Sequence, residues 1–225
     1  MRGLLLVWLC ACRINFDAQS DAGADTFDTR PGTTITFGER PASQRKGVTS
    51  DTRLDENQAN ANYGGSEDLS IAQFTANGEH SLLRFDLTSL APGTPVVGAR
   101  LMLARLDYGD ELPGMLRLRE VAESWLEGSN TGMPGTGATW STRDGTIPWS
   151  TAGATPAQLL GTIDSADEMV APIDAALVQR WIDTPATNHG VMLDAVPSVH
   201  VHVHASESAL LGGAGRPELA VDIVE

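Results

Sequence analysis

The feature that most constrains the fold is a set of short runs in which apolar and polar residues alternate with a period of two. The clearest runs are Leu83 to Leu87, Leu116 to Arg119, Val199 to His204 and Leu219 to Ile223. This period places one face of a strand on a core and the other in water. Turn signals such as Tyr63-Gly64-Gly65, Ala91-Pro92-Gly93 and Met133-Pro134-Gly135 separate the runs. The pattern therefore predicts many short strands joined by tight turns.

One segment, Asp174 to Ile182, has helical spacing instead. Leu177 and Trp181, and likewise Val178 and Ile182, are four residues apart and share one face of a helix. Short strands with a single late helix predict an all-β protein. We expect a jelly-roll-like, two-sheet antiparallel β-sandwich with one short helix.

The N-terminus resembles an export signal. One early Arg2 precedes the apolar run Leu4 to Leu9. Leu9-Cys10-Ala11-Cys12 resembles a bacterial lipobox, which makes Cys12 the candidate lipidated residue. A plain signal cleaved nearby, or a true start further upstream, are the alternatives. We expect an outer-membrane or cell-surface lipoprotein, otherwise an extracellular protein, that reaches a membrane only through its lipid anchor.

The signal-like N-terminus leads to a predicted division of the chain into three parts. Residues 1–12 are the signal and lipobox, residues 13–31 are a flexible linker rich in Asp, Ala, Gly, Ser and Thr, and residues 32–225 are the sandwich domain. Cys10 and Cys12 are the only cysteines, so the domain has neither a disulfide nor a thiol nucleophile. The net charge of −14 repels phosphate backbones and argues against nucleic acid as a partner.

Aromatic residues are candidates for a carbohydrate site, because sugars stack their C–H faces on exposed rings. We expect Trp125 and Trp181 to fill the core, since both lie among apolar residues. Trp149 follows a proline in a loop of small polar residues, and Tyr63 lies in a turn. Tyr63 and Trp149 are therefore the predicted carbohydrate-binding residues.

The sequence contains residues for two kinds of candidate metal site. His200, His202 and His204 share one strand face, with successive rings about 7 Å apart, and imidazoles in this arrangement can bind a metal. The alternative is a polar outer face on a Val-backed strand. A structural calcium ion is also possible among the acidic residues Asp51, Asp55, Glu56, Glu67 and Asp68, although no EF-hand spacing marks its ligands.

No catalytic motif is present. Glu123 and Glu127 flank Trp125 and could imitate a glycosidase pair, but a solvated pair at a strand end is the ordinary interpretation. The sequence has no G-x-S-x-G elbow, no H-E-x-x-H helix and no phosphate-binding glycine loop. We expect no enzymatic activity.

Several segments together resemble one family. Asp51 to Asp55, Asn62-Tyr63-Gly64 and Leu82 to Leu87 are similar to segments of DNRLRE domains and follow the same order, which continues through Glu123 to Gly128, Ala138-Thr139-Trp140, Asn188-His189-Gly190 and Arg216 to Leu219. The resemblance covers nearly all of residues 33–225. It implies a carbohydrate-binding-module-like β-sandwich of secreted bacterial proteins, some of which bind acidic polysaccharides such as alginate.

One departure bears on the ligand. Many members carry Ser-Arg-Glu near the C-terminus, where this chain has Ala205-Ser206-Glu207. The missing arginine and the negative net charge make an anionic ligand less favoured. The leading hypothesis is a non-catalytic cell-surface module whose partner is a polysaccharide or another envelope component. The alternative is a structural or adhesive envelope protein without a carbohydrate ligand, and a polysaccharide lyase is a third, weaker hypothesis.

Overall fold

The computed structural model describes residues 32–45, 49–166 and 168–224. The predicted lipidation site Cys12 and the predicted linker of residues 13–31 lie outside these ranges. Within them, no helix has both the length and the apolar character needed to cross a membrane.

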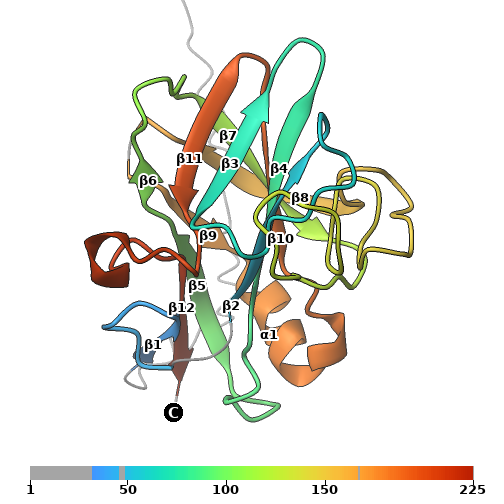
Figure 1. The fold of residues 1–225 in the computed structure, drawn as a ribbon. Coiled ribbons are helices and arrows are strands. Elements are labelled where there is room, and N and C mark those ends of the chain that lie inside the picture. Colours follow the sequence, from blue (N-terminus) through green and yellow to red (C-terminus); the bar gives the residue numbers. More distant parts are fainter. Residues whose placement is uncertain (1–31, 46–48, 167, 225) are drawn as a thin grey trace, which may run out of the picture.

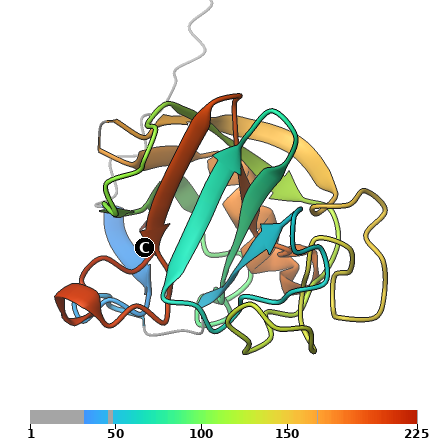
Figure 2. The same cartoon turned by 45° about the horizontal axis from the view of Figure 1, so that its top comes forward.

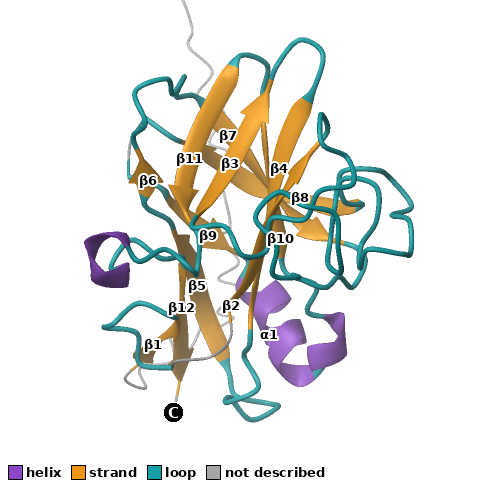
Figure 3. Cartoon of the chain, in the orientation of Figure 1, coloured by secondary structure: helices purple, strands orange, loops and turns teal. Residues whose placement is uncertain are grey.

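Two antiparallel sheets form a sandwich (Figures 1 and 3). The four-stranded sheet has the order β1-β12-β5-β9, and the eight-stranded sheet has the order β6-β11-β3-β4-β10-β7-β8, with β2 also paired to β4. The strands are β1 (Gly32–Gly38), β2 (Thr49–Asp55), β3 (Asp68–Gln73), β4 (Gly78–Phe85), β5 (Val96–Met102), β6 (Arg105–Leu106), β7 (Met115–Val121), β8 (Pro156–Asp164), β9 (Val170–Ile173), β10 (Val191–Ala195), β11 (Val199–His204) and β12 (Glu218–Val224). The predicted all-β sandwich with one short helix is confirmed.

The core between the sheets is built from the alternating runs. Val199, Val201 and Val203 of β11 are buried, as are Leu219 and Val221 of β12. Strand β12 pairs along its whole length with β1, so the two ends of the described chain lie side by side. Period-two alternation therefore fixes which face of each strand enters this core.

The short helix α1 (Ala175–Asp183) begins where the spacing predicts. Asp174 caps it by accepting a hydrogen bond from the backbone N–H of Ala176 at 3.0 Å. Its buried residues are Leu177, Val178, Trp181 and Ile182. The helix lies beside the lower end of the sandwich in Figure 1, followed by the 3-10 turn η1 (Pro185–Thr187). The expectation that Trp181 belongs to the core is confirmed.

A second apolar cluster lies on the outer face of the eight-stranded sheet. Leu82 and Leu83 of β4 are both completely buried, and they belong to different clusters. Leu82 packs with Leu54 and Met192 of the sheet and with Trp125 of the loop of residues 122–155, which covers them and is drawn in green and yellow in Figures 1 and 2. We call this segment the covering loop. Because it buries a second sheet face, β4 contacts apolar side chains on both sides.

The covering loop is held by the side chain of Asn62, which is fully buried. The Asn62 amide donates to the carbonyl of Glu127 at 2.6 Å and to that of Ala138 at 2.9 Å. Its oxygen accepts from the backbone N–H of Asn130 at 3.1 Å and from that of Gly64 at 3.4 Å. One buried side chain thus fixes three points along a loop that has no strand of its own.

Candidate functional site

Four aromatic rings form a row along the outer face of β3 and β11. Phe74 follows β3 directly, His200 and His202 project from β11, and Tyr108 lies in the turn after β6. The ring centroids are 5.4 Å apart for Phe74 and His200, 4.7 Å for His200 and His202, and 4.9 Å for His202 and Tyr108. Phe74 is 38% exposed and Tyr108 is 57% exposed. We call these four residues the ring row.

Carboxylates border the ring row. Glu111 lies 3.6 Å from His202 Nδ1, and Asp68 lies 3.9 Å from His202 Nε2. The backbone N–H of Tyr108 lowers the pKa of Glu111 to about 2, so this carboxylate is charged at neutral pH. Burial, reinforced by His200, lowers the pKa of His202. At neutral pH the row therefore combines a neutral imidazole with adjacent negative acceptors.

The three histidines of β11 do not converge as a metal site. His204 is 2% exposed, and its Nδ1 lies 2.8 Å from Ser208 Oγ. Gly215 lies against the His204 ring so closely that a methyl group there would overlap it. Within the described ranges, the three imidazoles do not form a group of potential ligands within metal-binding reach of one another. The structure thus separates His204 from His200 and His202, which belong to the ring row.

The predicted sugar-stacking residues Tyr63 and Trp149 are buried rather than exposed, at 4% and 5%. The guanidinium carbon of Arg53 lies 4.0 Å from the Tyr63 ring centroid and covers one face. Trp149 packs in the outer cluster and donates its indole N–H to the carbonyl of Thr139 at 2.9 Å. The expected exposure of both rings is not found, because the covering loop lies against the Tyr63 ring at Gly132 and packs its own Trp149 into the outer cluster.

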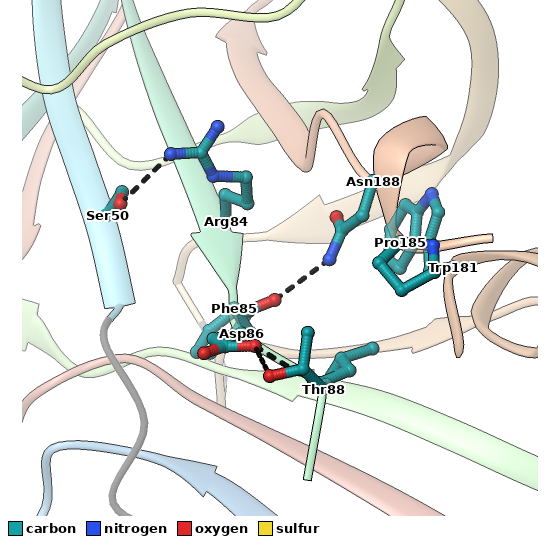
Figure 4. A pocket seen from close by; sticks show the side chains of 9 residues that line it. Ser50, Arg84, Phe85, Asp86, Thr88, Trp181, Pro185 and Asn188 are labelled. Atoms are coloured by element: carbon teal, nitrogen blue, oxygen red, sulfur yellow. Dashed lines mark hydrogen bonds between the residues drawn. The ribbon is translucent and has the colours of Figure 1, made fainter. Parts of the chain in front are cut away.

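A cavity of about 320 Å³ opens at the lower end of the sandwich, between β4 and α1 (Figure 4). The guanidinium of Arg84 extends into the space between β2 and β4, and Trp181 and Pro185 form the opposite wall. Burial lowers the pKa of Arg84. The residues that line this cavity are Ser50, Arg84, Phe85, Asp86, Leu87, Thr88, Trp181, Pro185 and Asn188.

Most polar groups of this cavity already have protein partners. Arg84 donates to the carbonyl of Trp125 at 3.3 Å and to Ser50 Oγ at 3.3 Å. Asn188 donates to the carbonyl of Phe85 at 2.9 Å, and Asp86 accepts from the hydroxyl of Thr88 at 2.6 Å. Among its lining residues, no aromatic ring is exposed. Unlike the ring row, the cavity therefore offers a sugar no exposed aromatic face.

Of the acidic residues considered for calcium, only Asp51 joins a group of carboxylates. Its partners are Glu127 and Glu207, which sequence reasoning did not select as ligands. Asp55 caps a turn by accepting from the backbone N–H of Asn57 at 2.8 Å. Asp68 lies 3.8 Å from Arg53. We call Asp51, Glu127 and Glu207 the carboxylate triad.

Glu123 and Glu127 do not behave as one solvated pair. Glu123 accepts from the hydroxyls of Ser150 at 2.8 Å and Thr155 at 2.5 Å, and these bonds, the Thr155 one above all, lower its pKa. Glu127 is half-buried and accepts from the backbone N–H of Asp51 at 2.6 Å. The expectation of two solvated carboxylates is therefore wrong for Glu127.

Comparisons with protein-family models and with curated proteins find no match to this chain. The similarity to DNRLRE domains accordingly stays a prediction from the sequence.

Proposed function

We propose that this protein is a non-catalytic module that binds a neutral polysaccharide at the cell surface. The observation that carries the proposal is the ring row, in which the exposed rings of Phe74 and Tyr108 flank two imidazoles beside carboxylate acceptors. It differs from the site expected from the sequence, since Tyr63 and Trp149 are buried.

The chemistry of the ring row suits a neutral sugar. Sugar rings present C–H faces that stack on aromatic side chains, and hydroxyl groups that donate to carboxylates. Asp68 supplies such an acceptor beside the rings. Glu111 accepts from the backbone N–H groups of Tyr108 and Gly109 and so positions the turn that carries Tyr108. The same two charges, with the net charge of −14, oppose a uronic-acid polymer. A neutral glycan is therefore favoured over the acidic ligands of some proteins that the sequence resembles.

A non-catalytic role is supported by the acidic residues near Trp125. Glu123 is engaged by the covering loop, and Glu127 is engaged by Asp51 and belongs to the carboxylate triad. Neither carboxylate lines the cavity of about 320 Å³. The surface location rests on the signal-like residues 1–12 and on Cys12.

Affinity gel electrophoresis tests the proposal. The protein is run through gels that contain β-glucan, xylan, mannan, alginate or polygalacturonate. We expect retardation by at least one neutral polymer and none by the two anionic ones. Tyr108→Ala and Phe74→Ala should each weaken that affinity about tenfold, which corresponds to the loss of one stacking contact.

The control is Leu159→Ala, which removes an exposed apolar side chain from β8, away from the ring row. It should leave retardation unchanged. Thr88→Arg, which fills the cavity beside Arg84, should also have no effect. Absence of retardation by every polymer would overturn the proposal. Retardation that persists in Tyr108→Ala but is lost in Thr88→Arg would move the site to the cavity.

A further inference from the structure

Three carboxylates from distant parts of the chain meet beside β2. Asp51 belongs to β2, Glu127 to the covering loop, and Glu207 to the connection between β11 and β12. One oxygen from each lies within 4.8 Å of the other two. Asp51 is 1% exposed, and the other two are less buried. None of the ion pairs formed between described residues includes any of the three.

Backbone groups hold the triad together. Glu127 accepts from the backbone N–H of Asp51 at 2.6 Å, and Asp51 accepts from the backbone N–H of Ser206 at 2.8 Å. The hydroxyl of Ser206 lies 3.1 Å from both carboxylate oxygens of Glu207. The three side chains are therefore positioned by the fold rather than by chance rotamers on a surface. Such an arrangement of like charges is unfavourable unless protons or a cation balance it.

A second observation points to a ligand at this place. Thr49 is 2% exposed, and its Oγ1 is buried without a hydrogen-bond partner among the described residues. Thr49 precedes Asp51 by two positions on β2, so both side chains lie on the same strand face. The Thr49 carbonyl also accepts from the hydroxyl of Ser206 at 3.4 Å. A buried hydroxyl without a partner is unfavourable, and a bound cation or its water would satisfy it.

We propose that Asp51, Glu127 and Glu207, assisted by Thr49 Oγ1, bind a calcium ion. The donors are all oxygens, and an all-oxygen site favours a hard cation over zinc or copper. Calcium takes six to eight oxygens at about 2.4 Å, so two ligand oxygens across the ion are about 4.8 Å apart. The separations within the triad fit that limit. Magnesium is smaller and requires stricter octahedral geometry, which makes it the poorer fit.

The ion would connect three segments. Strand β2, the covering loop and the β11–β12 connection each contribute one ligand, and the hydrogen bonds through Ser206 and Asp51 already join them. This inference is independent of the proposed polysaccharide function, because the triad shares no residue with the ring row. It also differs from the histidine site expected from the sequence.

The test uses the intact protein, freed of metal with EDTA and then exchanged into buffer. Isothermal titration with CaCl2 should show one site per chain, and the thermal midpoint should rise with CaCl2 more than with MgCl2 at equal concentration. Glu207→Gln should weaken calcium binding at least tenfold, because it removes one charged ligand at the less buried side. Glu168→Gln is the matched control, with the same change at an exposed glutamate outside the triad, and should bind as the wild type does.

Three outcomes would overturn the inference. These are absence of calcium binding by the wild type, an equal loss of affinity in Glu168→Gln, or unchanged affinity in Glu207→Gln. Should Glu207→Gln fail to fold, Asp51→Asn provides the second variant, since its amide oxygen still accepts from Ser206 while the charge is lost. Calcium-dependent stabilisation that persists in Asp51→Asn contradicts the proposal equally.

Discussion

The side-chain amide of Asn62 donates to the backbone carbonyl of Glu127 at 2.6 Å and so holds the main chain of the residue whose carboxylate accepts from the backbone N–H of Asp51. Asn62 belongs to the turn after β2, whereas Glu127 belongs to the covering loop, 65 residues further along the chain. Through this contact the turn positions both the loop over the outer cluster and one ligand of the carboxylate triad.

Asn62→Ala should therefore strongly destabilise the protein. It leaves two backbone carbonyls and two backbone N–H groups, all buried or partly buried, without their partner, and we expect a loss of about 3 kcal/mol in the free energy of unfolding. Urea denaturation measures this change. Asn60→Ala is the control, because Asn60 is exposed and its side chain makes no hydrogen bond to a described residue. A loss of less than about 1 kcal/mol in Asn62→Ala would contradict the assigned role.

A methyl group at Gly64 should have a similar effect for a steric reason. Its Cβ would overlap the backbone carbonyl of Glu127, which is held in place by the side-chain amide of Asn62. We expect Gly64→Ala to destabilise the protein by about 2 kcal/mol or more. Gly161→Ala on β8 meets no atom within 4 Å and should be neutral or slightly stabilising. Thermal denaturation of the two variants, run in parallel, compares a crowded glycine with an open one.

The stability of the metal-free protein should fall as the pH rises from about 4.5 to about 7. Burial raises the pKa of Glu127 to about 7, and Glu207 adds to the shift. Between the unfolded value of 4.5 and this folded value, the native state holds more protons than the unfolded state, so stability decreases as pH increases. Thermal midpoints measured in EGTA across this range should show the decline in the wild type and a flatter curve in Glu127→Gln. An identical slope in both proteins would refute this assignment.

Protonation of His202 should make the stability of the protein fall as the pH decreases, which is the opposite of the dependence expected for Glu127. Burial first, and then His200 and Arg53, lower the pKa of His202, while Asp68 and Glu111 oppose the shift. As the pH falls below the ordinary value of 6.5, the unfolded chain takes up a proton more readily than the native state does, so stability is lost on acidification. His202→Gln should retain more of its pH 7.5 thermal midpoint at pH 5.5 than the wild type. Both proteins are measured in saturating CaCl2, because a Glu127 carboxylate that binds calcium stays ionised and does not contribute to the pH dependence. Equal losses in the two proteins would contradict the prediction.

Much of the fold follows from local pattern. The alternation of Val and His along β11 placed the valines in the core, and the four-residue spacing in α1 placed Trp181 there. Both patterns succeed because one face of each element meets the core between the sheets. Period and spacing report that kind of burial directly.

The same reasoning failed where a loop supplies a second core. Trp149 and Tyr63 lie in segments rich in turn residues, which normally lie in solvent. The covering loop instead packs its own Ala138 and Ala154 on the outer face of the sheet and encloses Trp149. No local period encodes this, because the contacts join residues that are distant in the sequence.

The ring row and the carboxylate triad could not be predicted from the sequence for a related reason. Phe74 and Tyr108 occur singly in turns, and only the pairing of β3 with β11 and of β11 with β6 brings them beside the histidines. The triad is spread over Asp51, Glu127 and Glu207. The three residues lie in separate segments of the chain, so no spacing in the sequence marks them as one site.

The burial of Leu82 on the outer face of β4 has a consequence for any shortened form of this protein. Removing the covering loop would uncover Leu82 together with Leu54 and Met192, and so would expose an apolar patch on the face of a sheet. Patches of this kind promote self-association. Truncations that treat residues 122–155 as a dispensable surface loop should therefore yield aggregates rather than a smaller soluble sandwich.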